Sequence, residues 1–274
     1  MAIGTRIVAG VALAAAMPLA AAGAQAASRT LVALFAHPDD EVAVAPLLAR
    51  YAREGVQVYE VYVTGGEAGT GPGALTQRSD TIKAGAGLAR IRADEARCSA
   101  TALGVNPPII FDFPDGKLGD YLSDRTLNGR LADRLAQEMA RLKPDVVVTW
   151  GPDGGTGHPD HRMVSNVATQ LMRAGAVGMP ERLFYMSLPA EMLRAANPQR
   201  GEPPLLIPQA KYFTVRVPIA AGDIDAAGKA ISCHRSQFPP DIVARLVPAQ
   251  AGIFGGVVAV IPAFATAGGV DLFR

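Results

Sequence analysis

The sequence predicts an α/β protein built on a Rossmann-like, mostly parallel sheet with helices on both faces. Short apolar runs rich in Val and Ile alternate with helical patterns along most of the chain. Such runs are typical of strands buried on both faces, and strand–helix alternation is typical of parallel sheets. The 274 residues are 49% apolar and 19% charged, which allows a substantial core and excludes a disordered chain or a coiled coil.

Each expected element follows from its local pattern. The expected strands are Thr30–Ala36, Val56–Thr64, Ile109–Phe113, Asp145–Trp150 and Leu183–Leu188. The expected helices between them are Glu41–Arg53, Leu88–Leu103, Leu127–Leu142 and His161–Arg173. Pro144 ends the third helix directly before a strand, because proline cannot continue a helix.

Three stretches lack these patterns. Gly65–Gly87 holds seven glycines in 23 residues and is expected to be a long functional loop, without the spacing of a nucleotide-binding motif. Ala190–Ala210 is rich in proline and is expected to be a surface excursion. The last segment, Pro239–Arg274, is apolar and rich in glycine and is expected to pack as extended chain.

The first 26 residues have the layout of a secretory signal peptide. Arg6 precedes an apolar stretch from Ile7 to Ala22, and Ala24-Gln25-Ala26 follows as a cleavage site of the A-x-A type. The alternative is an uncleaved membrane anchor, which the alanine-rich run and its small terminal residues disfavour. We therefore expect a secreted or periplasmic protein with one domain over residues 27–274 and no transmembrane segment in the mature chain.

Charge and cysteine content narrow the class further. Lys and Arg number 26 against 25 Asp and Glu, and loss of Arg6 with the signal peptide would leave 25 of each. Nucleic-acid-binding domains normally carry a strongly basic face, so no nucleic-acid partner is expected. In an oxidising compartment Cys98 and Cys233, which lie far apart in the sequence, could form a disulfide, but the sequence does not decide whether they pair.

Three of the four histidines lie in two short clusters that each follow an expected strand. The first strand runs into Ala36-His37-Pro38-Asp39-Asp40-Glu41, and the fourth is followed by Gly157-His158-Pro159-Asp160-His161. Ligands of open parallel sheets bind beyond the carboxyl ends of the strands, at the switch point that the first and fourth strands commonly flank. We therefore expect both clusters to converge on one crevice, the active site.

The spacing within these clusters predicts a metal site. His37 and Asp40 are three residues apart, and so are the two histidines of the second cluster, so that each pair can meet one ion at the start of a helix. Three N or O ligands and a water are the open coordination of catalytic zinc, although such ligands also accept iron or cobalt. A carboxylate beside the ion can take a proton from water, and Asp39 is the candidate if Asp40 is a ligand. Spacing alone does not tell which of His158 and His161 binds the metal.

The clusters resemble the signatures of a known family, the zinc-dependent N-acetylglucosaminyl deacetylases that include the glycosylphosphatidylinositol-pathway de-N-acetylase (PIG-L) and the LmbE-like proteins. The two signatures are AHPDDE at 36–41 and HPDH at 158–161. The resemblance spans roughly residues 30–237. Its further motifs are GEAG at 66–69, Arg92-x-x-Glu95, FPDG at 113–116, PDVV at 144–147 and HRSQ at 234–237.

The resemblance implies a role for each residue that matches these signatures. Zinc would be held by His37, Asp40 and His161. Asp39 would be the general base that activates the attacking water. His158 would stabilise the tetrahedral oxyanion and help to protonate the leaving amine.

Three further residues are candidates for substrate binding. Arg92 matches an arginine near the pocket of family members, and its alternative is a helix-surface charge that pairs with Glu95. Asp115 matches an aspartate expected to accept hydrogen bonds from sugar hydroxyls, and its alternative is an Asp-Gly turn. His234 could close the pocket or be a satisfied structural histidine. Glu41 is most simply an acid in the first turn of a helix, where the helix dipole favours it.

Two departures from the family pattern concern the substrate rather than the metal. Ala227 stands where family members often have a lysine, and Thr156 stands where some have a tyrosine that contacts the reaction intermediate. Neither changes the residues expected to bind zinc.

The expected function is an extracytoplasmic zinc hydrolase that removes acetyl from an N-acetylated amino sugar, either a small molecule or an oligosaccharide. One alternative is an amidase of the same mechanism that acts on a different acyl-amide, such as a thiol conjugate. A second is a non-catalytic carbohydrate-binding protein, which an intact Asp39 disfavours because binding needs no base. Hydride transfer would suit the Rossmann-like order, but the glycine fingerprint is missing.

Overall fold

The structure is a computed structural model that describes Met1 and residues 29–69, 83–120, 124–155, 157–187, 208, 210–265 and 268–274. The expected signal peptide, most of the glycine-rich loop, most of the proline-rich excursion and Thr156 lie outside these ranges. No helix within the ranges is both long enough and apolar enough to span a membrane.

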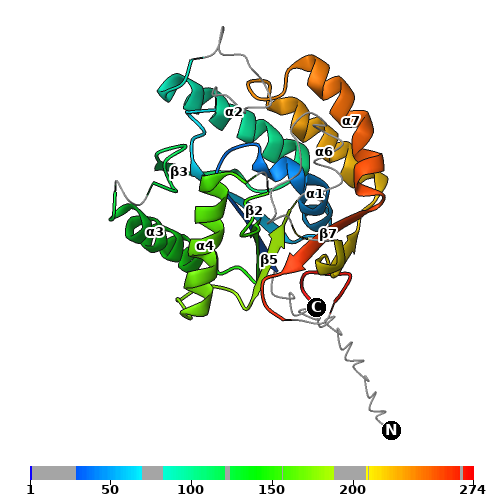
Figure 1. Ribbon diagram of the computed structural model, residues 1–274. Coiled ribbons are helices and arrows are strands. Elements are labelled where there is room, and N and C mark those ends of the chain that lie inside the picture. The colour runs from blue at the N-terminus through cyan, green and yellow to red at the C-terminus, as the bar shows by residue number, and fades with distance from the viewer. Residues whose placement is uncertain are drawn as a thin grey trace.

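The described strands form one seven-stranded sheet in the order β3-β2-β1-β4-β5-β7-β6 (Figure 1). They are β1 (Thr30–Phe35), β2 (Gln57–Thr64), β3 (Ile109–Phe113), β4 (Val146–Trp150), β5 (Arg182–Met186), β6 (Val215–Pro218) and β7 (Val257–Pro262). The first five pair in parallel, whereas β7 runs antiparallel to both β5 and β6. The prediction of a mostly parallel sheet is confirmed, and β1 lies beside β4, as the switch point requires.

Helices cover both faces of this sheet. They are α1 (Ala45–Arg53), α2 (Ala86–Leu103), α3 (Leu127–Leu142), α4 (Pro159–Arg173), α6 (Ala221–Cys233) and α7 (Pro240–Phe254), with short 3-10 turns η1 (Asp40–Ala43) and η3 (Ala210–Tyr212). α1, α2 and α6 pack on one face and α3 and α4 on the other, while α7 lies outside α6 (Figure 1).

Alternation along the strands builds two cores, one on each side of the sheet. In β1, Leu31, Ala33 and Phe35 face the α1/α2/α6 side, and Val32 and Leu34 face the α3/α4 side. All five are buried, because successive strand residues point to opposite faces and both faces are covered by helices. This explains why the strands read as continuous apolar runs in the sequence.

Two expectations about helices need correction. The helix expected over Glu41–Arg53 is divided into η1 and α1, because Pro46 has no N–H to donate and fits only in the first turn of a helix that starts at Ala45. The expectation of extended chain over Pro239–Arg274 is wrong for α7, although β7 is extended. Pro240 begins α7 as a first-turn proline, and apolar residues follow at helical spacing despite Pro248 in the interior.

The structure settles the pairing that the sequence left open. Cys98 in α2 and Cys233 at the end of α6 form a disulfide, with their Cα atoms 5.7 Å apart. The bond joins two helices that pack side by side on the same face of the sheet.

Candidate active site

The two histidine clusters meet at the carboxyl ends of β1 and β4. The first cluster forms the turn between β1 and α1, and the second forms the start of α4, with His158 as its N-cap. The rings of His37, His158 and His161 lie with their centroids 4.8 to 5.1 Å apart. The expected convergence of residues more than 120 positions apart is therefore confirmed.

Ligand atoms of His37, Asp40 and His161 lie close together in this cluster, and we call these three residues the ligand triangle. His37 Nδ1 and His161 Nε2 are 3.2 Å apart, and Asp40 Oδ1 lies 3.0 Å from the latter nitrogen. The other Asp40 oxygen, Oδ2, lies 3.8 Å from His37 Nδ1. Zinc bonds of about 2.0–2.2 Å at tetrahedral angles place ligand atoms about 3.3–3.6 Å apart, which is close to the two separations measured from His161 Nε2. The donor set of two imidazoles and one carboxylate suits zinc and also iron.

A second set of ligand atoms also lies close together in this cluster. Nitrogen atoms of His37, His158 and His161 lie within 4.8 Å of one another, so a metal could meet all three histidines. The geometry alone is compatible with His158 as a ligand or as a neighbour of the ion.

Carboxylates behind His37 set its tautomer. Its Nε2 lies 2.9 Å from Asp115 Oδ1 and 3.4 Å from Asp160 Oδ2, so this nitrogen carries a proton and Nδ1 is the nitrogen that a metal would use. Burial lowers the pKa of His37, but the hydrogen bonds to Asp115 and Asp160 raise it to about 10. Asp160 is held in turn by the backbone N–H groups of Gly116 and Leu118. Such outer carboxylates orient a metal-binding histidine and increase its basicity.

His161 is fixed in the complementary tautomer. Its Nδ1 donates to the carbonyl oxygen of Gly154 at 3.0 Å, which leaves the lone pair on Nε2, the atom of the triangle. The ring stacks on Trp150 at the end of β4, with an interplanar angle of 3°. Although burial opposes the charge, His161 and other neighbours hold the pKa of Asp40 well below its usual range.

Asp39 stands beside the triangle in an unusual backbone conformation. Its φ is 104° and its ψ is −13°, in the left-handed region that costs a non-glycine residue about 1–3 kcal/mol. Its carboxylate pairs with Arg92 at 3.0 Å, and the side chain is 20% exposed. Burial raises the pKa of Asp39 to about 6, although the charge of Arg92 opposes the shift. Unlike the three triangle residues, Asp39 therefore combines a carboxylate outside the triangle with partial access to solvent.

His158 presents one ring nitrogen to the same space. Its Nδ1 accepts the backbone N–H of Asp160 at 3.2 Å, so the proton of the neutral ring is on Nε2. Burial lowers the pKa of His158, and the neighbouring histidines lower it further. A neutral ring with its proton on Nε2 is a hydrogen-bond donor at that atom.

The three residues expected to bind substrate are all involved in internal contacts. Arg92 is buried and also donates to the carbonyl oxygens of Gly66 and Pro38, so its interpretation as a surface charge is wrong. Gly66 has a φ of 67°, and a Cβ there would lie 2.5 Å from the guanidinium carbon, so glycine is required. Asp115 accepts from His37 and from the Ala68 N–H.

His234 is wholly buried and does not line the space in front of the triangle. Its Nε2 lies 2.5 Å from Glu41 Oε1, and its exposed fraction is zero. This position agrees with the alternative of a satisfied structural histidine. Glu41, expected to be a simple first-turn acid, is also wholly buried, and nothing in its local pattern predicted its partners.

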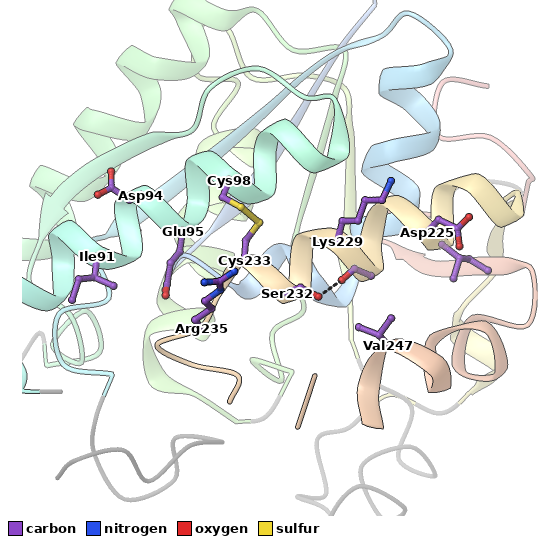
Figure 2. A pocket seen from close by; sticks show the side chains of 12 residues that line it. Ile91, Asp94, Glu95, Cys98, Asp225, Lys229, Ser232, Cys233, Arg235 and Val247 are labelled. Carbon is purple, nitrogen blue, oxygen red and sulfur yellow. Dashed lines mark hydrogen bonds between the residues drawn. A yellow bond between two sulfur atoms is a disulfide. The ribbon is translucent and has the colours of Figure 1, made fainter. Parts of the chain in front are cut away.

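A cavity of about 860 Å³ lies away from this cluster, between α2, α6 and α7 (Figure 2). The Cys98–Cys233 disulfide and Glu95 line it, together with apolar residues such as Ile91 and Val247. None of the residues that line it belongs to the histidine clusters.

The family model described as GlcNAc-PI de-N-acetylase, PIG-L, matches residues 32–172. The match begins within β1 and ends within α4, so it contains both histidine clusters. This chain belongs to the PIG-L family.

A curated relative agrees with this assignment. The chain is 30% identical over 248 residues to 1D-myo-inositol 2-acetamido-2-deoxy-alpha-D-glucopyranoside deacetylase 2 of Catenulispora acidiphila, with 77% of this chain and 80% of the relative covered. As a member of the PIG-L family, the chain is an enzyme of the deacetylase class, an amide hydrolase that acts on a C–N bond other than a peptide bond.

Solved structures share the PIG-L fold. N,N'-diacetylchitobiose deacetylase from Pyrococcus horikoshii has a TM-score of 0.57 at 21% identity, with 86% of this chain and 85% of that chain covered. GalB, the 4-carboxy-2-hydroxymuconate hydratase from Pseudomonas putida KT2440, has the same TM-score at 18% identity, with 87% and 98% covered. Because a hydratase shares the fold, the fold alone does not assign the reaction.

Proposed function

We propose that this PIG-L family enzyme is an extracytoplasmic, zinc-dependent deacetylase that releases acetate from an N-acetylglucosamine-type sugar. The observation that carries the proposal is the meeting, at one sheet switch point, of a ligand triangle, a partly exposed carboxylate paired with Arg92, and a neutral imidazole donor. The relatives named for sugar deacetylation support the substrate class.

His37, Asp40 and His161 would hold the metal. A divalent ion bound there would supply a Lewis acid that polarises the amide carbonyl and makes water more acidic. The side chains of Asp115, Asp160 and the Gly154 carbonyl keep the two imidazoles in the required tautomers. Because the pKa of His37 is raised, His37 would release a proton from Nδ1 on metal binding, while its Nε2–H stays bonded to its carboxylates.

Asp39 and His158 would carry out the proton transfers. Asp39, with a carboxylate that is partly exposed, accepts a proton from the water that attacks the amide carbon. His158 donates a hydrogen bond from Nε2 to the oxyanion, a contact worth roughly 10²–10³ in rate in comparable hydrolases. The amine then leaves with a proton, for which Asp39, protonated in the first step, is the available acid.

The location outside the cytoplasm has two supports. The first 26 residues carry the pattern of a signal peptide, and the chain holds a disulfide, a bond that persists in oxidising compartments. Expression of the full chain in a bacterial host with N-terminal sequencing of the exported product tests this: a mature N-terminus at Ala27 is expected. Retention of Met1 on a cytoplasmic or membrane-bound product would contradict it.

Acetate release with Asp39→Asn as the key variant tests the reaction. The zinc-loaded wild type should release acetate from N-acetylglucosaminyl inositol or N,N'-diacetylchitobiose and not from N-acetylated thiol conjugates. Asp39→Asn should keep the bound metal and lose about 10²–10⁴ in kcat, because the amide cannot accept the proton. Asp112→Asn, the same change at an exposed position in β3, is the matched control.

Three outcomes would contradict the proposal in different ways. If Asp39→Asn releases acetate at the wild-type rate, Asp39 is not the general base. Acetate release from thiol conjugates alone would show that the substrate is a thiol conjugate and not an amino sugar. Sugar binding without acetate release from any amide would indicate a carbohydrate-binding protein instead.

A further inference from the structure

Glu41 accepts four hydrogen bonds immediately behind the proposed base. Its Oε2 accepts the backbone N–H of Asp39 at 2.9 Å and the hydroxyl of Tyr62 at 2.8 Å. Its Oε1 accepts from Ser99 Oγ at 2.6 Å and lies 2.5 Å from His234 Nε2. With two donors on each oxygen and no exposure to solvent, the carboxylate is fully satisfied and held in one orientation.

The donors come from separate parts of the fold. Tyr62 lies in β2, Ser99 lies in α2 and His234 follows α6. Ser99 and His234 are the residues directly after Cys98 and Cys233, so the disulfide fastens the two segments that hold the Glu41 carboxylate (Figure 2). The carboxylate is thus anchored by the core of the α1/α2/α6 side of the molecule.

The contact to Asp39 has a specific consequence. Among the described residues, Glu41 Oε2 is the hydrogen-bond acceptor for the Asp39 N–H, and Asp39 has the strained φ of 104°. Strained conformations persist only where their surroundings hold them. Loss of this acceptor would let the Asp39 backbone relax to a negative φ, which would turn its carboxylate away from the space in front of the triangle.

The neighbouring metal ligand does not depend on Glu41. Asp40 Oδ2 accepts the backbone N–H groups of Ala36 and His37, both at 3.0 Å, so the end of β1 holds it. Glu41 should therefore control the orientation of the base while the ligand triangle stays in place.

We propose that Glu41 is a positioning residue that locks the left-handed backbone of Asp39 and so aims the general base. The expected loss of kcat rests on the proposed function, whereas the expected change in the Asp39 backbone rests on geometry alone. Glu41 acts through Asp39 and touches no reacting atom.

Two substitutions at Glu41 separate positioning from simple packing. Glu41→Ala removes the acceptor, and kcat should fall roughly 10- to 100-fold, in line with the cost of small misplacements of a reacting group. KM should change less than about twofold and metal stoichiometry should stay at the wild-type value, since Asp40 is held elsewhere. Glu41→Gln can still accept the Asp39 N–H through its amide oxygen, with its NH₂ toward Ser99 and His234, and should recover most of kcat.

A structural readout tests the inference without turnover. Exchange of the Asp39 amide hydrogen, followed at residue resolution in the metal-loaded protein, should be at least about tenfold faster in Glu41→Ala than in wild type and close to wild type in Glu41→Gln. Glu138→Ala removes a buried carboxylate of α3, on the opposite face of the sheet, and is the matched control for lost stability. It should lower Tm without a change in kcat or in Asp39 exchange.

The outcomes distinguish this inference from the proposed function. Wild-type kcat and wild-type Asp39 exchange in Glu41→Ala would overturn the positioning role. If Glu41→Ala does not fold, Glu41→Gln becomes the deciding variant. A large loss of kcat together with fast Asp39 exchange in Glu41→Gln would overturn the inference, because glutamine keeps the acceptor for the Asp39 N–H. If wild type releases no acetate but Asp39 exchange still follows Glu41, the proposed function fails and the backbone lock stands.

Discussion

His37 has two ring nitrogens with different neighbours, and this asymmetry is the residue-scale basis of the site. Nε2 faces Asp115 and Asp160, whereas Nδ1 faces His161 and Asp40. A carboxylate on one side of the ring increases the electron density that the other side offers to a metal. Asp115 therefore contacts a candidate metal-binding histidine on the side away from the ligand triangle.

The substitution Asp115→Asn tests this assignment. It removes the negative charge behind His37 and should weaken metal affinity about 10- to 100-fold. Competition with a chromophoric chelator measures the change, and Asp112→Asn, an exposed aspartate of β3, is the control. Unchanged metal affinity together with a raised KM for the sugar would instead support the expected role in substrate binding.

Glu60 is a second acid whose protonation depends on its surroundings. It is wholly buried in β2, and neither carboxylate oxygen has a hydrogen-bond partner among the described residues. Burial raises the pKa of Glu60 well above its ordinary value, and the negative charge of Glu41 raises it further. The folded protein therefore keeps a proton on Glu60 at a pH where the unfolded chain has lost it.

This shift predicts a loss of stability as pH rises. Glu60 ionises near pH 4.3–4.5 in the unfolded chain, so its stabilising effect is complete below that pH and declines by up to about 1.4 kcal/mol per unit above it, until the folded pKa is reached. Glu60→Gln stays neutral and should remove this slope. Urea unfolding of both proteins between pH 5 and 7 measures the difference, and parallel profiles would show that Glu60 is ionised in the folded state.

At the scale of elements, the packing of α2 against α6 joins the core to the site. The disulfide and the Ser236–Glu95 hydrogen bonds tie the segment after α6 to α2, and Arg92 of α2 reaches Asp39. α7, in contrast, lies outside α6, and Gln250 is the one buried residue along it. The active-site side of this layer is therefore more strongly held than its outer helix.

Replacement of both cysteines by serine should lower stability measurably. The disulfide links residues 135 positions apart, and removal of such a cross-link costs about 2–5 kcal/mol through the greater freedom of the unfolded chain. Guanidinium unfolding of Cys98→Ser/Cys233→Ser beside oxidised wild type measures the loss, with reduced wild type as the control. An unchanged midpoint would mean that helix packing alone holds α2 to α6.

At the scale of the whole molecule, the ligand triangle connects two halves of the sheet. His37 and Asp40 follow β1, and His161 lies in α4 after β4, so one ion would join segments separated by more than 120 residues. A ligand that binds only the folded state stabilises it by mass action, by about 2.7 kcal/mol at a free concentration 100 times its Kd.

Metal addition should therefore raise Tm, and chelation should lower it. His161→Ala removes one ligand and should abolish most of the metal-dependent rise, whereas Asp112→Asn should retain it. Differential scanning calorimetry of metal-free and zinc-loaded protein measures both effects. An equal rise in His161→Ala would locate the stabilising metal elsewhere.

The sequence alone was enough to predict the five parallel strands of the sheet, the convergence of the clusters and the family resemblance. Strand and helix patterns are local, and parallel connections place the ends of β1 and β4 together, so residues 37 and 161 could be brought to one place without a structure. The bounds of β3 and α3 agree with expectation to the residue because their apolar spacing and flanking residues are unambiguous.

The partners of Glu41, His234 and Asp115 and the pairing of the cysteines could be learned only from the folded structure. Glu41 lies in the first turn after the motif, and no periodicity connects it with Ser99 or His234. Such hydrogen bonds depend on how side chains from distant elements meet in a core where each polar atom must find a partner. Local sequence pattern does not predict such long-range side-chain contacts. The residues that support the site could therefore be identified only in the folded chain.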